Sequence, residues 1–198
     1  MPARLDEHPL GLSWTIDETM ARTSHALVHD GRVWFVDPVA DPEALQRAES
    51  LGEPAAVVQL LDRHGRDGPA LAARLGIPCL EVPDAVPETP FEVVKVVDVP
   101  RWHERALWWP ERRALVVAEA VGTARFYRFG PAPAGMHLLL RLAPPGALRR
   151  FEPEHLLPGH GRPLHGPDAA TGLRAAYDRS RRDLPRVVRA LPAMLRGG

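Results

Sequence analysis

The sequence predicts a protein of the α/β class, and two observations support this prediction. Between residues 55 and 82, an apolar run, a short helical segment and a second apolar run follow one another, as in a βαβ unit. Two β-hairpins, predicted within residues 24–36 and 106–118, lie on either side of this unit. Because no linker divides the 198 residues, we expect a single domain over residues 1–198.

The first hairpin is marked by its turn. Ser24–Val28 and Arg32–Val36 are strand-like runs, and the Asp30-Gly31 pair between them is a strong signal for a two-residue hairpin turn. We expect His25 and His29 to face solvent or a neighbouring strand.

A helix and the βαβ unit follow. Asp41 is an expected N-cap, followed by a proline in the first turn, and Gly52 ends this helix. The βαβ unit is then predicted as a strand over Ala55–Leu61, a helix over Pro69–Leu75 and a strand over Ile77–Val82. The first of these strands is almost continuously apolar, which is typical of a strand covered on both faces.

The second half of the chain begins with a strand over Glu92–Val99. A second hairpin pairs Ala106–Trp109 with Ala114–Ala118, and Glu119 follows it directly. Residues 122–150 are rich in Gly, Pro and Arg and are expected to form a long ordered excursion. Within it, His137 is interpreted as a packed histidine rather than a ligand.

The last segment, residues 168–195, has a helical pattern that Pro185 should kink or divide. Its outer face is rich in arginine, which raises the hypothesis of an RNA-associated protein. Asp178 and Asp183 interrupt that face and no aromatic ladder accompanies it, so a solvated face is favoured and nucleic acid is not an expected partner.

Composition limits the class of protein. The formal net charge is zero, which does not indicate a general electrostatic attraction to nucleic acid. Cys79 is the single cysteine, so no internal disulfide can form, and we expect it in the core. There is no secretory signal and no apolar stretch long enough to cross a membrane, so we expect a soluble cytoplasmic protein.

Two loops contain the candidate site residues. In Leu156-Leu157-Pro158-Gly159-His160-Gly161, an apolar run ends at a histidine between two glycines, which permit a sharp turn and a close approach to a ligand. The alternative is a tight surface turn with an incidental histidine. The second loop, Asp62–Asp67, follows an apolar strand and contains His64. In open α/β sheets, ligands bind beyond the carboxyl ends of such strands.

The order of these elements and the late Leu-Pro-Gly-His-Gly segment resemble the metallo-β-lactamase superfamily over roughly residues 13 to 182. The hairpin ending Phe35-Val36-Asp37-Pro38 is similar to the opening hairpin of that family. The resemblance implies a four-layered αβ/βα sandwich of two mixed β-sheets with outer helices, and a metal site along one edge.

The resemblance also implies a ligand set. His64 and His160 match family ligands, Glu119 stands where the family has an aspartate, and His103 matches only if the register shifts by one residue. The H-x-H-x-D-H motif of the family falls on residues 62–67, where Arg66 replaces the aspartate. Because a guanidinium repels a dication, one metal ion is expected rather than two.

Two functional hypotheses follow. In the first, His64, His160 and Glu119 hold one zinc ion, with manganese or iron as alternatives, and metal-bound water hydrolyses an ester, thioester, lactone or phosphoester. Asp67 is then a fourth ligand or the catalytic base. In the second, Arg66 forms a salt bridge with Asp67 or Glu119, no metal binds, and the cleft of a pseudoenzyme holds a small molecule or a protein partner.

Overall fold

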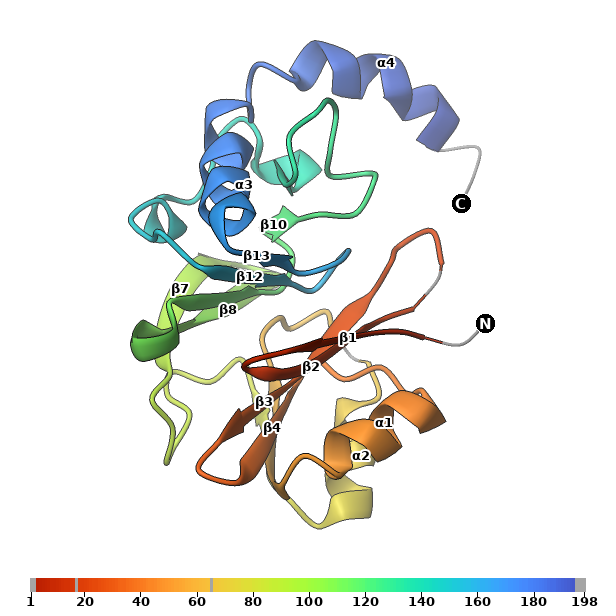
Figure 1. The fold of residues 1–198 in the computed structure, drawn as a ribbon. Coiled ribbons are helices and arrows are strands. Elements are labelled where there is room, and N and C mark those ends of the chain that lie inside the picture. The colour runs from red at the N-terminus through yellow and green to blue at the C-terminus, as the bar shows by residue number, and fades with distance from the viewer. Residues whose placement is uncertain (1–2, 17, 65, 195–198) are drawn as a thin grey trace.

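The computed structural model describes residues 3–16, 18–64 and 66–194, and it consists of two β-sheets packed face to face with helices on their outer surfaces (Figure 1). This arrangement is the predicted αβ/βα sandwich. No helix among the described residues is long and apolar enough to cross a membrane.

The first sheet has six strands in the order of the sequence. They are β1 (Arg4–His8), β2 (Gly11–Thr15), β3 (Thr23–His29), β4 (Arg32–Val36), β5 (Glu53–Gln59) and β6 (Cys79–Glu81). Strands β1 to β4 are antiparallel, whereas β5 and β6 run parallel to β4. The β1–β2 hairpin was not predicted, because the charged β1 lacks the apolar residues that mark a strand.

The second sheet has five strands in the order β13-β12-β9-β8-β7. They are β7 (Glu92–Val99), β8 (Trp102–Trp109), β9 (Ala114–Val117), β12 (His155–Pro158) and β13 (Leu164–His165). Strands β9 and β12 are parallel, and the other neighbours are antiparallel, with a bulge in β7 between Lys95 and Val97. The excursion after β9 contains the short pair β10 (Val121–Gly122) and β11 (Gly135–Met136).

Helices cover the outer faces of both sheets (Figure 1). On the first sheet these are α1 (Pro42–Glu49) and α2 (Gly68–Leu75), and on the second sheet α3 (Pro167–Asp178). Helix α4 (Leu184–Met194) lies beyond α3, and 3-10 turns are found at Pro110–Arg112, Leu138–Leu140 and Gly146–Leu148. The predicted division near Pro185 is observed between α3 and α4, and Leu195 lies outside the described residues. Asp41 caps α1 as predicted, accepting a hydrogen bond from the Ala44 amide.

Successive side chains of a strand point to opposite faces of the sheet, and this explains how the layers pack. In β4, Trp34 and Val36 face the core between the sheets, whereas Val33 and Phe35 face α1 and α2. In β9, Val116 faces the inner core and its neighbours face α3. Each central strand therefore buries both of its faces, which explains the continuous apolar runs in the sequence.

The ring of His25 is 1% exposed and faces a neighbouring strand, which is one of its two predicted environments. Its Nε2–H donates to the carbonyl oxygen of Pro158 (3.2 Å), and its Nδ1 accepts from the Ser13 hydroxyl (2.7 Å). Ser13 in turn accepts from Nε2 of His8 (2.9 Å). This chain of hydrogen bonds joins the edge strand β1 to β12 of the other sheet.

Cys79 was expected in the core, but it is only partly buried.

The buried His25 predicts loss of stability in acid. Burial lowers the pKa of His25 from 6.5 to about 3, so the unfolded chain takes up this proton first as the pH falls below 6.5. The free energy of unfolding should then fall by about 1.4 kcal/mol per pH unit from this ring alone. Urea unfolding at pH 5, 6 and 7 should give a shallower pH dependence for His25→Gln than for wild type. An equal slope in both proteins contradicts the assignment, and His29→Gln on the same strand is the control.

Candidate metal centre

The candidate site lies where the central strands of both sheets end. Strands β4 and β5 are parallel in one sheet, and β9 and β12 are parallel in the other, so their carboxyl ends lie at one edge of the sandwich. Asp37 follows β4, the loop containing His64 follows β5, Glu119 follows β9 and His160 follows β12. The topology thus gathers four side chains that are distant in sequence.

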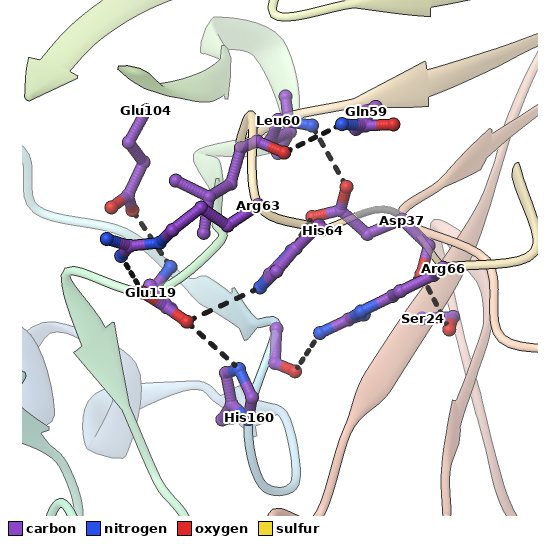
Figure 2. Close-up of polar contacts among 12 residues, drawn as sticks. Ser24, Asp37, Gln59, Leu60, Arg63, His64, Arg66, Glu104, Glu119 and His160 are labelled. Atoms are coloured by element: carbon purple, nitrogen blue, oxygen red, sulfur yellow. Dashed lines mark hydrogen bonds and ion pairs between the residues drawn. The ribbon is translucent and has the colours of Figure 1, made fainter. Parts of the chain in front are cut away.

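The structure brings three of the predicted ligands together. Oε1 of Glu119 lies 3.8 Å from Nε2 of His64 and 3.9 Å from Nε2 of His160, and the three ligand atoms lie within 4.8 Å of one another. Figure 2 shows the three side chains pointing toward one another. Both Nε2 atoms are buried and have no hydrogen-bond partner in the described part of the chain.

Each imidazole is oriented through its other nitrogen. Nδ1 of His64 donates to Oδ2 of Asp37 (2.9 Å), whose Oδ1 accepts from the amide of Leu60 (2.9 Å). Nδ1 of His160 donates to the carbonyl oxygen of Met20 (2.9 Å). These partners assign the ring protons to Nδ1 and turn the Nε2 lone pairs toward Glu119, as in many histidine metal ligands.

The pKa values of the three side chains differ. Burial lowers the pKa of His160 to about 4, so its ring is neutral at pH 7. Burial also opposes ionisation of Glu119, but His64 and the Arg63 guanidinium outweigh it and hold the pKa at about 2. For His64, burial is outweighed by the Asp37 carboxylate, which raises the pKa. In the metal-free protein, His64 is therefore protonated more readily than a free imidazole, at the nitrogen that faces Glu119.

The donor set fits one divalent ion. Zinc bonds to imidazole nitrogen and carboxylate oxygen are about 2.0–2.2 Å long, so two donors at tetrahedral angles lie about 3.4 Å apart. The two histidine-to-Glu119 distances of 3.8 and 3.9 Å are slightly longer, so small side-chain movements would bring these donors onto one ion. Two imidazoles and a carboxylate suit zinc, and also manganese or iron.

Gly65 lies outside the described residues. Its neighbour Arg66 stands at the motif position where the family has an aspartate. Its guanidinium donates to main-chain carbonyl oxygens at the ends of three strands: Thr23 (2.7 Å), Asp37 (2.9 Å) and Gly159 (3.0 Å). The expected salt bridge of Arg66 with Asp67 or Glu119 is not formed; Glu119 pairs with Arg63 instead (2.6 Å).

Two predicted site residues lie elsewhere. Asp67 precedes α2, and its Oδ2 accepts from the amide of Ala40 (2.7 Å), which turns the carboxylate toward the loop after β4. The ring of His103 is 46% exposed and donates to Asp98 (2.6 Å). Because side chains alternate along β8, the buried Trp102 and Glu104 place His103 on the opposite face of the strand. The structure therefore does not support Asp67 as a base or His103 as a ligand.

The supporting roles of three residues, Asp37, Glu104 and His137, were not predicted from the sequence. Glu104 is fully buried and accepts from the amides of Glu119 (2.9 Å) and Ala120 (2.8 Å), so it holds the turn after β9. Nε2 of His137 lies 4.0 Å from Oε2 of Glu119. Asp37 and His137 each follow a strand, which is the same signal that identified Glu119.

The histidine turn after β12 is buried rather than exposed, since His160 is only 3% exposed. Gly159 passes so close to the main chain of Ala118 that a Cβ atom would lie 2.4 Å from its carbonyl oxygen. Gly161 has φ +89°, a conformation that favours glycine. Both glycines are thus required for the turn that places His160 opposite Glu119.

Comparisons with known proteins identify the fold. No family model and no curated protein match the chain. Among solved structures, a DIM-1 metallo-β-lactamase exposed to ceftazidime has a TM-score of 0.60 and 13% identity, covering 92% of this chain and 98% of its own. VMB-1 at pH 5.5 has a TM-score of 0.60 and 11% identity, with 90% and 96% covered. A metallo-β-lactamase from Hirschia baltica has a TM-score of 0.61 and 10% identity, with 89% and 98% covered.

The chain therefore has the metallo-β-lactamase fold, as its sequence motifs suggested. At these identities the similarity extends to the arrangement of helices and strands. The chemistry of the site has to be argued from its own side chains.

The raised pKa of His64 predicts how metal affinity depends on pH. An ion at Nε2 must displace the proton that a charged His64 ring carries there, whereas burial keeps His160 neutral. Zinc affinity should rise by up to about tenfold per pH unit below the pKa of His64 and level off above it. Competition with a chromophoric chelator between pH 6 and 8 measures this dependence. An affinity that stays constant over the whole range would contradict the assignment.

Asp37 should matter for metal binding although it is not a ligand. Asp37→Asn removes the negative charge that orients His64, and the loss of such a partner lowers metal affinity by about 10- to 100-fold. Asp67→Asn is a matched control, because its carboxylate lies outside the site. Equal zinc affinities for the two variants would show that Asp37 does not support His64.

Proposed function

We propose that this protein is a metal-dependent hydrolase that holds one ion between His64, Glu119 and His160 and acts on an ester, thioester, lactone or phosphoester. The observation that carries the proposal is the pair of buried Nε2 atoms, both without a partner in the described part of the chain and both facing one carboxylate oxygen. A buried polar atom without a partner is costly, and an ion between the three side chains would satisfy both.

The ion would supply one element of the chemistry. Zinc held by such ligands lowers the pKa of a bound water to about 7 and provides a nucleophile at neutral pH. Two of the similar structures, DIM-1 and the protein from Hirschia baltica, are named metallo-β-lactamases, which supports this class of chemistry.

The side chains of the protein would set the geometry and charge of the site. Asp37 and the Met20 carbonyl hold the two imidazoles, and Arg63 holds the second oxygen of Glu119. The Arg63 guanidinium also stacks on Trp102, 4.2 Å from the ring centroid, which restricts its motion. With these partners in place, Oε1 of Glu119 remains directed toward the two histidines.

The site opens into a pocket of about 370 Å³, lined by Met20, Arg22, Arg63, His64, Arg66, Glu119 and His160. A volume of this size suits a small-molecule substrate. A larger pocket of about 480 Å³ lies beside α3 and contains none of the three proposed ligands, so we place the reaction in the smaller one.

The second candidate function is a metal-free binding module, and one observation favours it. Arg63 already neutralises Glu119, and Arg66 adds a second fixed positive charge beside the ligand atoms. In this alternative the same pocket binds a small molecule without chemistry.

Metal titration separates the two functions. Zinc at about a hundred times its dissociation constant should stabilise the native state by about 2.7 kcal/mol. For a chain of this size the melting midpoint should rise by roughly 5 to 10 °C, and a chelator should reverse the rise. Glu119→Gln should reduce the shift strongly, whereas His103→Ala should keep it, since His103 lies outside the site.

The same samples test hydrolysis. Chelator-treated protein should lose activity toward test substrates that contain an ester, thioester, lactone or phosphoester bond. Zinc, manganese or iron should restore this activity. If no metal moves the melting midpoint and purified protein contains none by elemental analysis, the hydrolase proposal fails and the binding module replaces it.

A further inference from the structure

We infer that the pocket binds an oxyanion group of its ligand, a carboxylate or a phosphate, through Arg66 and Arg22 beside the proposed metal ligands. The part of this inference that concerns the substrate rests on the proposed function. Binding of the oxyanion itself requires no metal. It names a ligand class that the three metal ligands alone do not specify.

The first observation is that Arg66 is bound by neutral groups and keeps donors free. Nη1 donates twice and Nη2 once, always to main-chain carbonyl oxygens. Nε is buried and has no acceptor among the residues that the structure describes. Because a guanidinium has five N–H donors, one N–H of Nη2 is left without an acceptor besides the buried Nε, and this Nη2 donor is the one left for a ligand.

The second observation is the excess of positive charge. Among the described residues, three arginines and one carboxylate line the pocket, together with the two imidazoles. Arg63 is neutralised by Glu119, and Arg22 forms a two-point ion pair with Glu18. Among the described residues, Arg66 forms no salt bridge with a carboxylate, and Asp37 and Glu119 act on its charge only from beyond hydrogen-bond distance. Its charge is therefore the one that an incoming anion would pair with.

The third observation is the position of Arg22. It forms an isolated bridge with His160, so its main chain lies beside the proposed ligand, and its side chain is 38% exposed. Arg22 can therefore exchange part of its contact with Glu18 for an anion in the pocket. Two guanidinium groups on one side of a pocket form the planar, multidentate donor set that carboxylate and phosphate groups bind.

The rest of the ligand would lie toward the mouth of the pocket. Met20 lines it and is 47% exposed, although it is a large apolar side chain. A small molecule with an oxyanion at one end and an apolar part at the other matches this arrangement. Methionine adapts to irregular apolar surfaces and so accepts a range of such groups.

The test uses chelator-treated full-length protein, with inorganic phosphate and acetate as the two probes and sodium chloride added to keep ionic strength constant. Binding is followed by calorimetry and, for phosphate, by ³¹P line width. We expect saturable binding of at least one probe, and the tighter one identifies phosphate or carboxylate as the recognised group.

The variants locate the binding. Arg22→Gln should raise the dissociation constant at least tenfold. Arg182→Gln, in the larger pocket beside α3, should leave it within twofold of wild type. Arg66→Lys keeps a positive charge but loses the fork and should weaken binding at least tenfold. Because Arg66 joins three strand ends, this variant is first checked for a wild-type circular dichroism spectrum, and if it does not fold, Arg22→Gln alone decides.

The outcomes separate this inference from the proposed function. No saturable binding of either probe, or equal affinity in wild type and Arg22→Gln, overturns the oxyanion site even if zinc still raises the melting midpoint. Saturable binding that depends on Arg22, without any metal effect, supports the oxyanion site and rejects the hydrolase.

Discussion

The hydrogen bonds of the Arg66 guanidinium are the interaction on which the site depends. They join the start of β3, the end of β4 and the end of β12, and thus connect the two sheets at the edge where the candidate ligands lie. Carbonyl oxygens are neutral, so they satisfy the donors of Arg66 without cancelling its charge. One side chain therefore fixes the spacing between the sheets and places a permanent cation where the family motif has a metal-binding aspartate.

A buried charge of this kind needs balancing groups. Asp37 and Glu119 provide negative charge, and His64 lies between them. Glu104 is satisfied by the main-chain amides of Glu119 and Ala120 and by the Trp102 indole. Because these groups share partners in a region of low dielectric, changing one alters the charge state of its neighbours. This coupling explains why the pKa of His64 is raised while that of His160, whose Nδ1 donates to a carbonyl oxygen rather than to a carboxylate, is lowered.

Much of the architecture could be predicted from the sequence because apolar runs and turn residues mark the strands. The candidate ligands His64, Glu119 and His160 were predicted for a similar reason, since each follows an apolar strand. Asp67 and His103 were misplaced because a motif alignment does not fix which face of a strand or loop a side chain takes. Asp37 has a left-handed backbone conformation that ends β4 and turns its carboxylate inward, and no local pattern indicates this. The contacts of Arg66 join residues far apart in sequence, so only the folded chain shows them.

The four edge strands of the two sheets affect how copies of this chain associate in solution. An open strand edge can pair with another chain and begin aggregation. Here β1 carries Arg4, Asp6 and Glu7, β6 and β13 are only three and two residues long, and the bulge of β7 interrupts its ladder beside Lys95. Each edge is therefore charged, short or irregular, so strand pairing between copies is disfavoured even though the sandwich is not closed into a barrel.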